Sequence, residues 1–236
     1  ARLWGAGFLP SRHQGVRMRG QGDPVLYLSN PQGVNRATRE RMLEGLKAMN
    51  QRQFEQTGDP EIQTRIAQYE MAFRMQFAVP DTFDTSQESQ ATLEMYGDSE
   101  YAKGCLLARR MIERGVRMVQ LSHSIDGYDI AWDTGHGDIQ GGHARLAQAC
   151  DQGIAALIKD LKQRDMFDDT LIVFASEFGR TPMAQGNGRD HHIKGYSIFL
   201  AGGGIKPGTT VGATDDLGYN AVEDIVTVHD LHATML

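Results

Sequence analysis

Cysteine, long apolar runs and an excess of basic charge are all scarce in this sequence. The 236 residues include two cysteines, Cys105 and Cys150, too few for a disulfide framework, so cysteine usage does not fix the redox compartment. No run approaches the roughly 20 apolar residues of a membrane-spanning helix, and no transmembrane segment is expected. Lys and Arg number 24 against 30 Asp and Glu, and the net charge of −6 disfavours nucleic acid as a partner.

The rest of the composition is that of an ordinary folded domain. Apolar residues make up 40% of the chain and charged residues 23%, which excludes a disordered, collagen-like or coiled-coil chain. No secretion signal is visible. The chain opens with ARLWGAGFLP, without Met, and closes with HDLHATML, so we expect both ends to be cut from a longer protein.

The first part of the chain has the pattern of helices. Asn35 is suited to cap a helix, Pro60 fits the first turn of a second helix, and Pro80 is expected to end it. After about residue 95 the residue pattern changes to short runs of β-branched and apolar residues. We therefore divide the chain into a mostly helical segment, 1–95, and an α/β part, 96–236.

The α/β part alternates helices with short apolar runs that have the length of buried strands. Helices are expected over 100–113, where Gly115 follows as a stop, and over 143–164; strands are expected over 116–121, 170–175 and 196–201. Alternation of this kind is typical of layered α/β proteins with parallel strands.

Carboxylates and histidines gather just after the expected strands, where parallel sheets bind their ligands. Carboxylate oxygens and neutral imidazole nitrogens together suit a divalent cation. The plainer interpretation is that these Asp residues cap turns, the His residues are ordinary surface or core groups, and Glu177 pairs with Arg180. The residues concerned are Asp133, His136, Glu177, Arg180, Asp190, His191 and His192.

Several sequence blocks in a fixed order resemble one bacterial family. The blocks are Trp132-Asp133 with His136, Ser176-Glu177-Phe178-Gly179-Arg180-Thr181-Pro182, Gly188-Arg189-Asp190-His191-His192, and His229-Asp230-Leu231-His232. This pattern is similar to the family called domain of unknown function 1501, usually placed in the alkaline-phosphatase and sulfatase superfamily. The likeness runs over nearly the whole chain.

The resemblance implies a fold and a location. It implies a three-layer α/β/α sandwich with a largely parallel sheet, like alkaline phosphatase. This chain would be the C-terminal part of that domain, with a helical N-terminal segment. Members of the family often begin with an export signal, which implies a periplasmic or exported parent protein.

The resemblance also implies a metal site with an anion clamp beside it. Phe178 stands where the superfamily has a second-pair His, which weakens one metal position. Zinc, manganese or calcium would be the divalent metal. By resemblance the ligands are Asp133, His136, Glu177 and His191, with Arg180 as the anion clamp and Asp190 and His192 orienting the ligands.

Two function hypotheses follow. The first is a metal-dependent hydrolase of sulfate or phosphate esters, acting on a small-molecule or glycan ester. Its nucleophile would lie outside this chain, so little turnover is expected from the chain alone. The second is a sulfatase-like scaffold that binds a surface glycan or a protein without catalysis. The sequence does not determine the substrate or the oligomeric state.

Cys105 is a separate feature that needs an interpretation of its own. Cys105 and Arg109 have the spacing of the sulfatase motif in which Cys becomes formylglycine, but Leu107 replaces the Pro of that motif. Cys105 also lies on an amphipathic helical pattern, so we expect a buried structural thiol.

Overall fold

The computed structural model describes residues 9, 13–19, 24–25, 30–123, 132 and 136–236. Within it the chain divides into two compact units, Ala1–Glu88 and Ser89–Leu236. Among the described helices, none combines the length and apolar character needed to cross a membrane.

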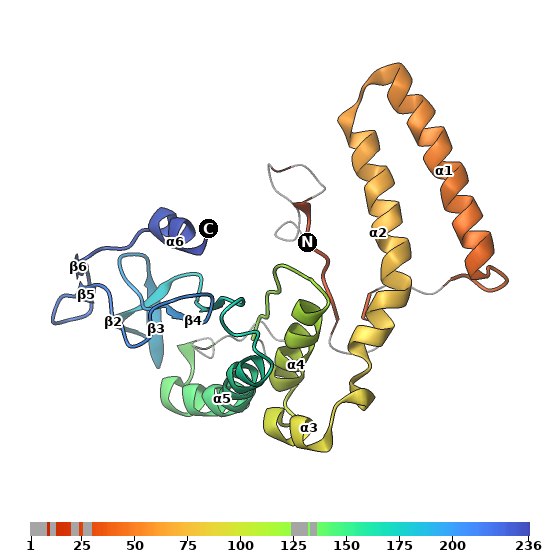
Figure 1. Cartoon of the computed structure of the whole chain (residues 1–236). Coiled ribbons are helices and arrows are strands. Elements are labelled where there is room, and N and C mark those ends of the chain that lie inside the picture. The colour runs from red at the N-terminus through yellow and green to blue at the C-terminus, as the bar shows by residue number, and fades with distance from the viewer. Residues whose placement is uncertain (1–8, 10–12, 20–23, 26–29, 124–131, 133–135) are drawn as a thin grey trace. The chain divides into compact units, whose positions relative to one another are not determined.

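The first unit contains a pair of antiparallel helices, α1 (Arg36–Thr57) and α2 (Pro60–Phe83), followed by the short 3-10 helix η3 (Thr85–Gln87) (Figure 1). As predicted, Asn35 caps α1: its side chain accepts a hydrogen bond from the Thr38 amide at 2.9 Å. Gly58 ends α1 in the left-handed conformation, with φ of 67°. Pro60 begins α2, also as predicted.

The prediction that Pro80 ends the second helix is wrong, because α2 continues to Phe83. Pro80 removes one backbone donor, yet the last turn closes around it. The Asp84 amide donates to the Pro80 carbonyl at 2.9 Å, and the Thr82 hydroxyl donates to the Ala78 carbonyl at 2.7 Å. Burial of Val79 and Thr82 adds packing to this turn, which offsets the missing bond.

The second unit begins with three helices, α3 (Gln90–Tyr96), α4 (Glu100–Glu113) and α5 (Ile139–Gln163). The predicted helix over 100–113 is confirmed, and Gly115 follows it with a φ of 84°. The three helices share a core of Tyr96, Cys105, Leu106 and Ala156. The expected burial of Cys105 is confirmed, and both cysteines are free thiols.

A closed ring of four charges joins α4 to α5. Arg109 donates from Nε to Asp160 at 2.9 Å and from Nη1 to Glu113 at 2.7 Å. Arg164 donates to the same two carboxylates, at 2.7 Å and 2.8 Å. The Tyr96 hydroxyl adds a fifth group at 3.0 Å from Asp160, and burial raises the pKa of this phenol. The ring is buried at Arg109 and Asp160, so it fixes how the two helices pack.

The rest of the second unit consists of short strands and a final helix. The strands are β1 (Ile172–Phe174), β2 (Gly179–Gln185), β3 (Gly188–His192), β4 (Phe199–Ala201), β5 (Ala213–Thr214) and β6 (Ala221–Glu223), followed by α6 (Val228–Met235). In the described part of the chain they form three two-stranded sheets, β1–β4, β2–β3 and β5–β6, all antiparallel.

The predicted three-layer α/β/α sandwich with a largely parallel sheet is therefore contradicted. Strands do occur within 170–175 and 196–201, but they pair with each other antiparallel, with Ile172 opposite Ala201. The chain between them contains the β2–β3 hairpin where a parallel connection requires a crossover, usually a helix. The chain reverses direction there, and antiparallel pairing is the result.

The expected strand over 116–121 is absent as well, because this segment pairs with no described strand and only its end packs on the helices. After the turn at Gly115, the Val116 amide donates back to the Met111 carbonyl at 3.0 Å. Leu121 then packs on the helical core, while Met118 is exposed. Val116 is 41% exposed, and the run pairs with no strand in the described part of the chain.

Candidate functional site

Most of the predicted site residues lie on or beside the β2–β3 hairpin. Arg180 on β2 is directly opposite His191 on β3, and Gly179 is opposite His192. Glu177 comes two residues before β2 and is exposed. A Cβ at Gly179 would lie 2.5 Å from the Gly195 carbonyl oxygen, so glycine is required where β2 begins. The hairpin thus brings Glu177, Arg180 and His191 to one place.

His136 reaches this hairpin from a different part of the chain. It precedes the N-cap of α5, Asp138, whose side chain accepts a hydrogen bond from the Gly141 amide at 3.0 Å. The His136 carbonyl accepts a hydrogen bond from the Asn187 amide at 2.9 Å, at the tip of the hairpin. The centroids of the His136 and His191 rings lie 6.1 Å apart. Two of the four predicted metal ligands are therefore neighbours.

Three side chains of the hairpin form a stack. The Phe178 ring lies 4.2 Å from the His191 ring, at an interplanar angle of 35°. The Arg180 guanidinium lies 5.3 Å from the centroid of the same Phe178 ring. Arg180 also donates to the Arg189 carbonyl at 3.4 Å. The Phe178 ring is thus in contact range of both a cation and an imidazole.

Glu177 is held in its charged form. The Ser176 hydroxyl donates to its carboxylate at 2.7 Å, and this bond is the main cause of a pKa below the ordinary value of 4.5. The backbone amide of Glu177 lowers the pKa further, and the charges of Arg180 and His191 add to the effect. Glu177 is thus a carboxylate at neutral pH, as a metal ligand has to be.

The two residues predicted to orient the ligands have different positions. Asp190 accepts a hydrogen bond from the His191 amide at 2.7 Å, so it contacts the backbone of that residue. His192 is buried, with 3% of its surface exposed, and its ring lies 5.2 Å from Tyr219. Its Nε2 has no hydrogen-bond partner within the described residues. Sequence reasoning missed Tyr219, which the Asp215 carboxylate holds in place by accepting from its amide at 2.7 Å.

The donor types of this site fit a divalent metal, whereas its described geometry fits only in part. Among the residues that the structure describes, no group of three His, Cys, Asp or Glu could hold a metal ion. Asp133, the fourth predicted ligand, lies outside the described residues. Two imidazoles on one tetrahedral metal have ring centroids about 5 Å apart, so His136 and His191 would need to approach by about 1 Å.

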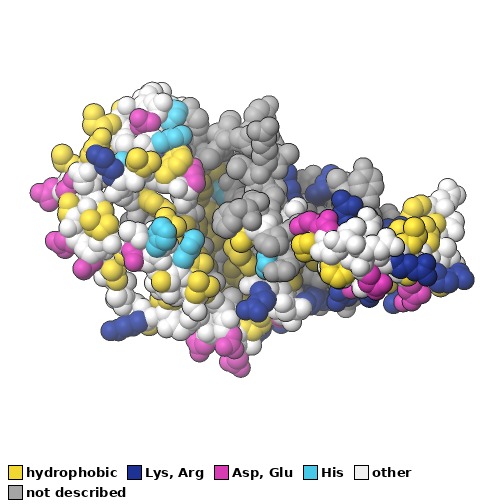
Figure 2. All heavy atoms as spheres, turned by 90° about the horizontal axis from the view of Figure 1, so that it is seen from above, with side chains coloured by type: hydrophobic (Ala, Val, Ile, Leu, Met, Phe, Trp, Pro, Cys, Tyr) yellow, Lys and Arg dark blue, Asp and Glu magenta, His cyan; other side chains and the backbone are white. Residues whose placement is uncertain are grey.

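The surface of the second unit around the strands is rich in exposed apolar side chains. Figure 2 shows histidines among hydrophobic side chains over this C-terminal part of the chain. Ile193 is 88% exposed and Leu217 is 76% exposed, while Phe199 on β4 is about half exposed. Single exposed apolar residues are common on protein surfaces and need no special explanation.

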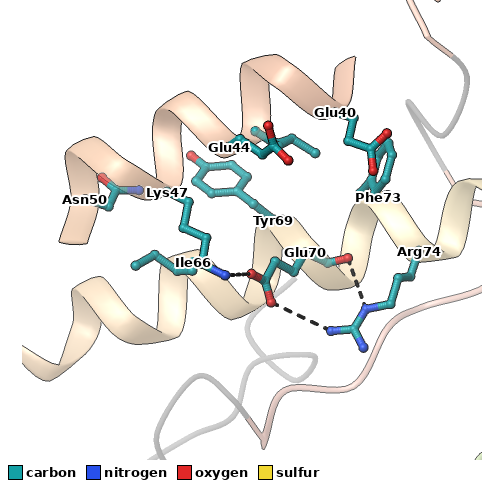
Figure 3. A pocket seen from close by; sticks show the side chains of 10 residues that line it. Glu40, Glu44, Lys47, Asn50, Ile66, Tyr69, Glu70, Phe73 and Arg74 are labelled. Atoms are coloured by element: carbon teal, nitrogen blue, oxygen red, sulfur yellow. Dashed lines mark hydrogen bonds and ion pairs between the residues drawn. The ribbon is translucent and has the colours of Figure 1, made fainter. Parts of the chain in front are cut away.

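The first unit has a cavity of its own, a groove of about 390 Å³ between α1 and α2 (Figure 3). Three of the charged side chains that line it interact with one another. Lys47 donates to Glu70 at 2.6 Å, and Arg74 lies 3.9 Å from the same carboxylate. The pKa of Glu70 is lowered mainly by its hydrogen bond with Lys47. None of the predicted site residues lines this groove.

Comparisons with known proteins give one family and no closer relative. A search of curated proteins found no match, and a search of solved structures found none either. A family model described as "Protein of unknown function (DUF1501)" matches residues 1–236. The match spans both units and every described residue of the candidate site, in agreement with the resemblance of the sequence blocks. The chain belongs to the DUF1501 family.

Proposed function

We propose that the β2–β3 hairpin and the His136 segment bind a divalent metal ion and hydrolyse a sulfate or phosphate ester there. The observation that supports this best is the meeting of His136 and His191, whose rings lie 6.1 Å apart although they are remote in sequence. Asp133 and Glu177 complete the proposed ligand set. Two imidazoles favour zinc or manganese over calcium, which prefers oxygen ligands.

Each residue of the hairpin has a role in this proposal. A bound metal would polarise the ester and stabilise charge on the group being transferred. Glu177 contributes a carboxylate that is already ionised. Arg180 binds the tetrahedral anion through its guanidinium, and Phe178 holds that guanidinium by stacking. Asp190 fixes the backbone of His191.

The proposal extends the superfamily resemblance to the chemistry of the site alone. The described residues form no parallel sheet, so the proposal rests on the residues that match the motifs and not on the fold. Export of the parent protein, and a nucleophile supplied by a longer chain, belong to the same proposal.

Calorimetric titration with zinc and with manganese tests the metal site. We expect binding of one ion and a loss of at least tenfold in affinity in both His191→Ala and Glu177→Gln. His229→Ala is the matched control, because His229 is an exposed histidine on α6 without a proposed role, and its affinity should be unchanged. Equal affinities in all four proteins would refute the site.

Hydrolysis is tested separately with aryl sulfates and aryl phosphates, using this chain and the longest protein that contains it. We expect turnover by the longer protein that a chelator abolishes and that added zinc or manganese restores. Rates that are equal with and without chelator would contradict metal-dependent hydrolysis.

A binding scaffold without catalysis is the second candidate, and the position of Phe178 favours it. The ring of Phe178 covers His191 at 4.2 Å, at the position where the superfamily motif has a further ligand. In that case the same surface would bind a glycan or a protein. Protein that binds no metal and whose melting temperature does not change on adding metal would favour this candidate over the hydrolase.

A further inference from the structure

The tip of the β2–β3 hairpin contacts the backbone of His136 at close range. Gly186 and Asn187 form the turn between β2 and β3. The Asn187 amide donates to the His136 carbonyl at 2.9 Å. A Cβ built on Gly186 would lie 2.9 Å from the same oxygen, closer than real Cβ atoms come to their neighbours. The turn can therefore dock on His136 only while position 186 has no side chain.

His136 itself needs support from outside its own segment. Its φ of 63° is in the left-handed region, which costs free energy in a residue with a side chain. The N-cap at Asp138 fixes the chain shortly after it, through the bond from the Gly141 amide. The bond from Asn187 holds the carbonyl of His136 itself. These two anchors fix the backbone from which the imidazole of His136 projects toward β3.

We propose that Gly186 is a positioning residue, whose missing side chain lets the hairpin turn hold His136 beside His191. His191 lies on β3 of this hairpin, and the Asn187 amide at the tip of the hairpin donates to the His136 carbonyl. The hairpin therefore contributes to the distance between the two rings. The geometric part of this inference stands without any metal. Its consequence for metal affinity rests on the proposed function.

Two alanine variants separate the docking contact from ordinary backbone strain. Gly186 has a φ of 57° and Gly204 a φ of 78°, so alanine is strained at both positions. A Cβ at Gly204 meets nothing within 4 Å, whereas a Cβ at Gly186 meets His136. Gly204→Ala is therefore the matched control for Gly186→Ala.

The first measurement is amide hydrogen exchange of Asn187 by NMR. In the unaltered protein this amide should be protected, and its exchange should become at least tenfold faster in Gly186→Ala but not in Gly204→Ala. The ring signals of His136 and His191 should shift in Gly186→Ala alone. An unprotected Asn187 amide in the unaltered protein, or the same exchange rate in both variants, would overturn the proposal.

The second measurement is zinc affinity, which we expect to fall about tenfold or more in Gly186→Ala and to stay within about twofold in Gly204→Ala. Equal affinities in the two variants would contradict the positioning role. If the unaltered protein binds no zinc, the proposed function fails, and the exchange of the Asn187 amide still decides whether Gly186 positions His136.

Discussion

The helix pairs α4–α5 and α1–α2 both carry ion pairs, but they place them in opposite environments. The α4–α5 ring has its Arg109 and Asp160 side chains 1% and 4% exposed. The α1–α2 pair, Lys47 with Glu70, has side chains 59% and 41% exposed. Buried charges are costly when one partner is lost, while exposed pairs contribute little. The buried ion pairs therefore hold α4 and α5 together more firmly than the exposed pair holds α1 and α2.

The helix pair α4–α5 also buries more apolar side chains than the pair α1–α2. None of the residues of α1 is buried, and its Met42, Leu46 and Met49 are exposed. By contrast α5 buries Leu146, Cys150, Ala156 and Leu161. The His136 segment leads directly into α5, so the candidate site is attached to the better-packed pair.

Among the substitutions that test this difference, Asp160→Asn should reduce the stability of the protein most. The amide cannot balance two guanidiniums, and Arg109 would stay buried without full compensation, at a cost of about 3–5 kcal/mol in the free energy of unfolding. Urea denaturation followed by circular dichroism measures this. Asp151→Asn on the exposed face of the same helix is the control and should stay within about 0.5 kcal/mol. Equal losses of unfolding free energy in both variants would show that the buried ring of charges does not stabilise the protein more than an exposed carboxylate does.

Gly→Ala substitutions in the two helix pairs should have opposite signs. A Cβ at Gly153 on α5 would lie 2.8 Å from the Ala102 Cα on α4, so Gly153→Ala should destabilise by about 1–3 kcal/mol. Gly45 on α1 has open space around it, so Gly45→Ala should stabilise α1 by about 0.5–1 kcal/mol. Thermal unfolding measures both, and the same sign in both variants would contradict the packing difference.

Alkaline pH should weaken the α3–α5 core through Cys105. Burial raises the pKa of this thiol from 9.0 to about 12. The unfolded chain therefore loses this proton before the folded chain does, so the stabilisation is complete below pH 9 and is lost as the pH rises toward 12. Urea unfolding between pH 8 and pH 10 should show a smaller alkaline loss in Cys105→Ala than in the unaltered protein. An unchanged loss would mean that the pKa of Cys105 is not raised in the folded state.

Glu70→Gln should have the smallest effect. Lys47 holds the pKa of Glu70 below 4.5, so any stabilisation from this pair is present at neutral pH and lost as the pH falls through that lowered pKa. Both side chains are solvated and screened by salt, so the melting temperature at pH 7 should match that of the unaltered protein within error. A clear drop would mean that α1 and α2 depend on this pair more than its exposure indicates.

Local signals predicted several helix boundaries. Asn35 caps α1 as predicted, and the helix over Glu100–Glu113 has the predicted limits. The predicted start of α5 at 143 is four residues late, because Asp138 is the true N-cap and the Gly141-Gly142 pair conceals a helix start. Caps and apolar spacing are short-range properties, so one sequence is enough to read them.

Strand pairing depends on partners that are remote in sequence, and there the prediction was wrong. The runs over 170–175 and 196–201 have strand character, but nothing in either run specifies a parallel or antiparallel neighbour. One local signal was available: Gly186-Asn187 between β2 and β3 is typical of a two-residue hairpin turn. Recognising it would have predicted the hairpin and the pairing of Gln185 with Gly188, but the register shift between Arg180 and Ala184, which brings Arg180 opposite His191, has no such local signal.

Anomalous diffraction at the zinc edge, from crystals of the zinc-loaded protein, shows whether His136 and His191 bind the same metal ion. We expect a peak within about 2.0–2.1 Å of one ring nitrogen of His136 and one of His191, with the two rings closer together than 6.1 Å. A peak at another place in the chain, or no peak between these two histidines, would contradict this expectation.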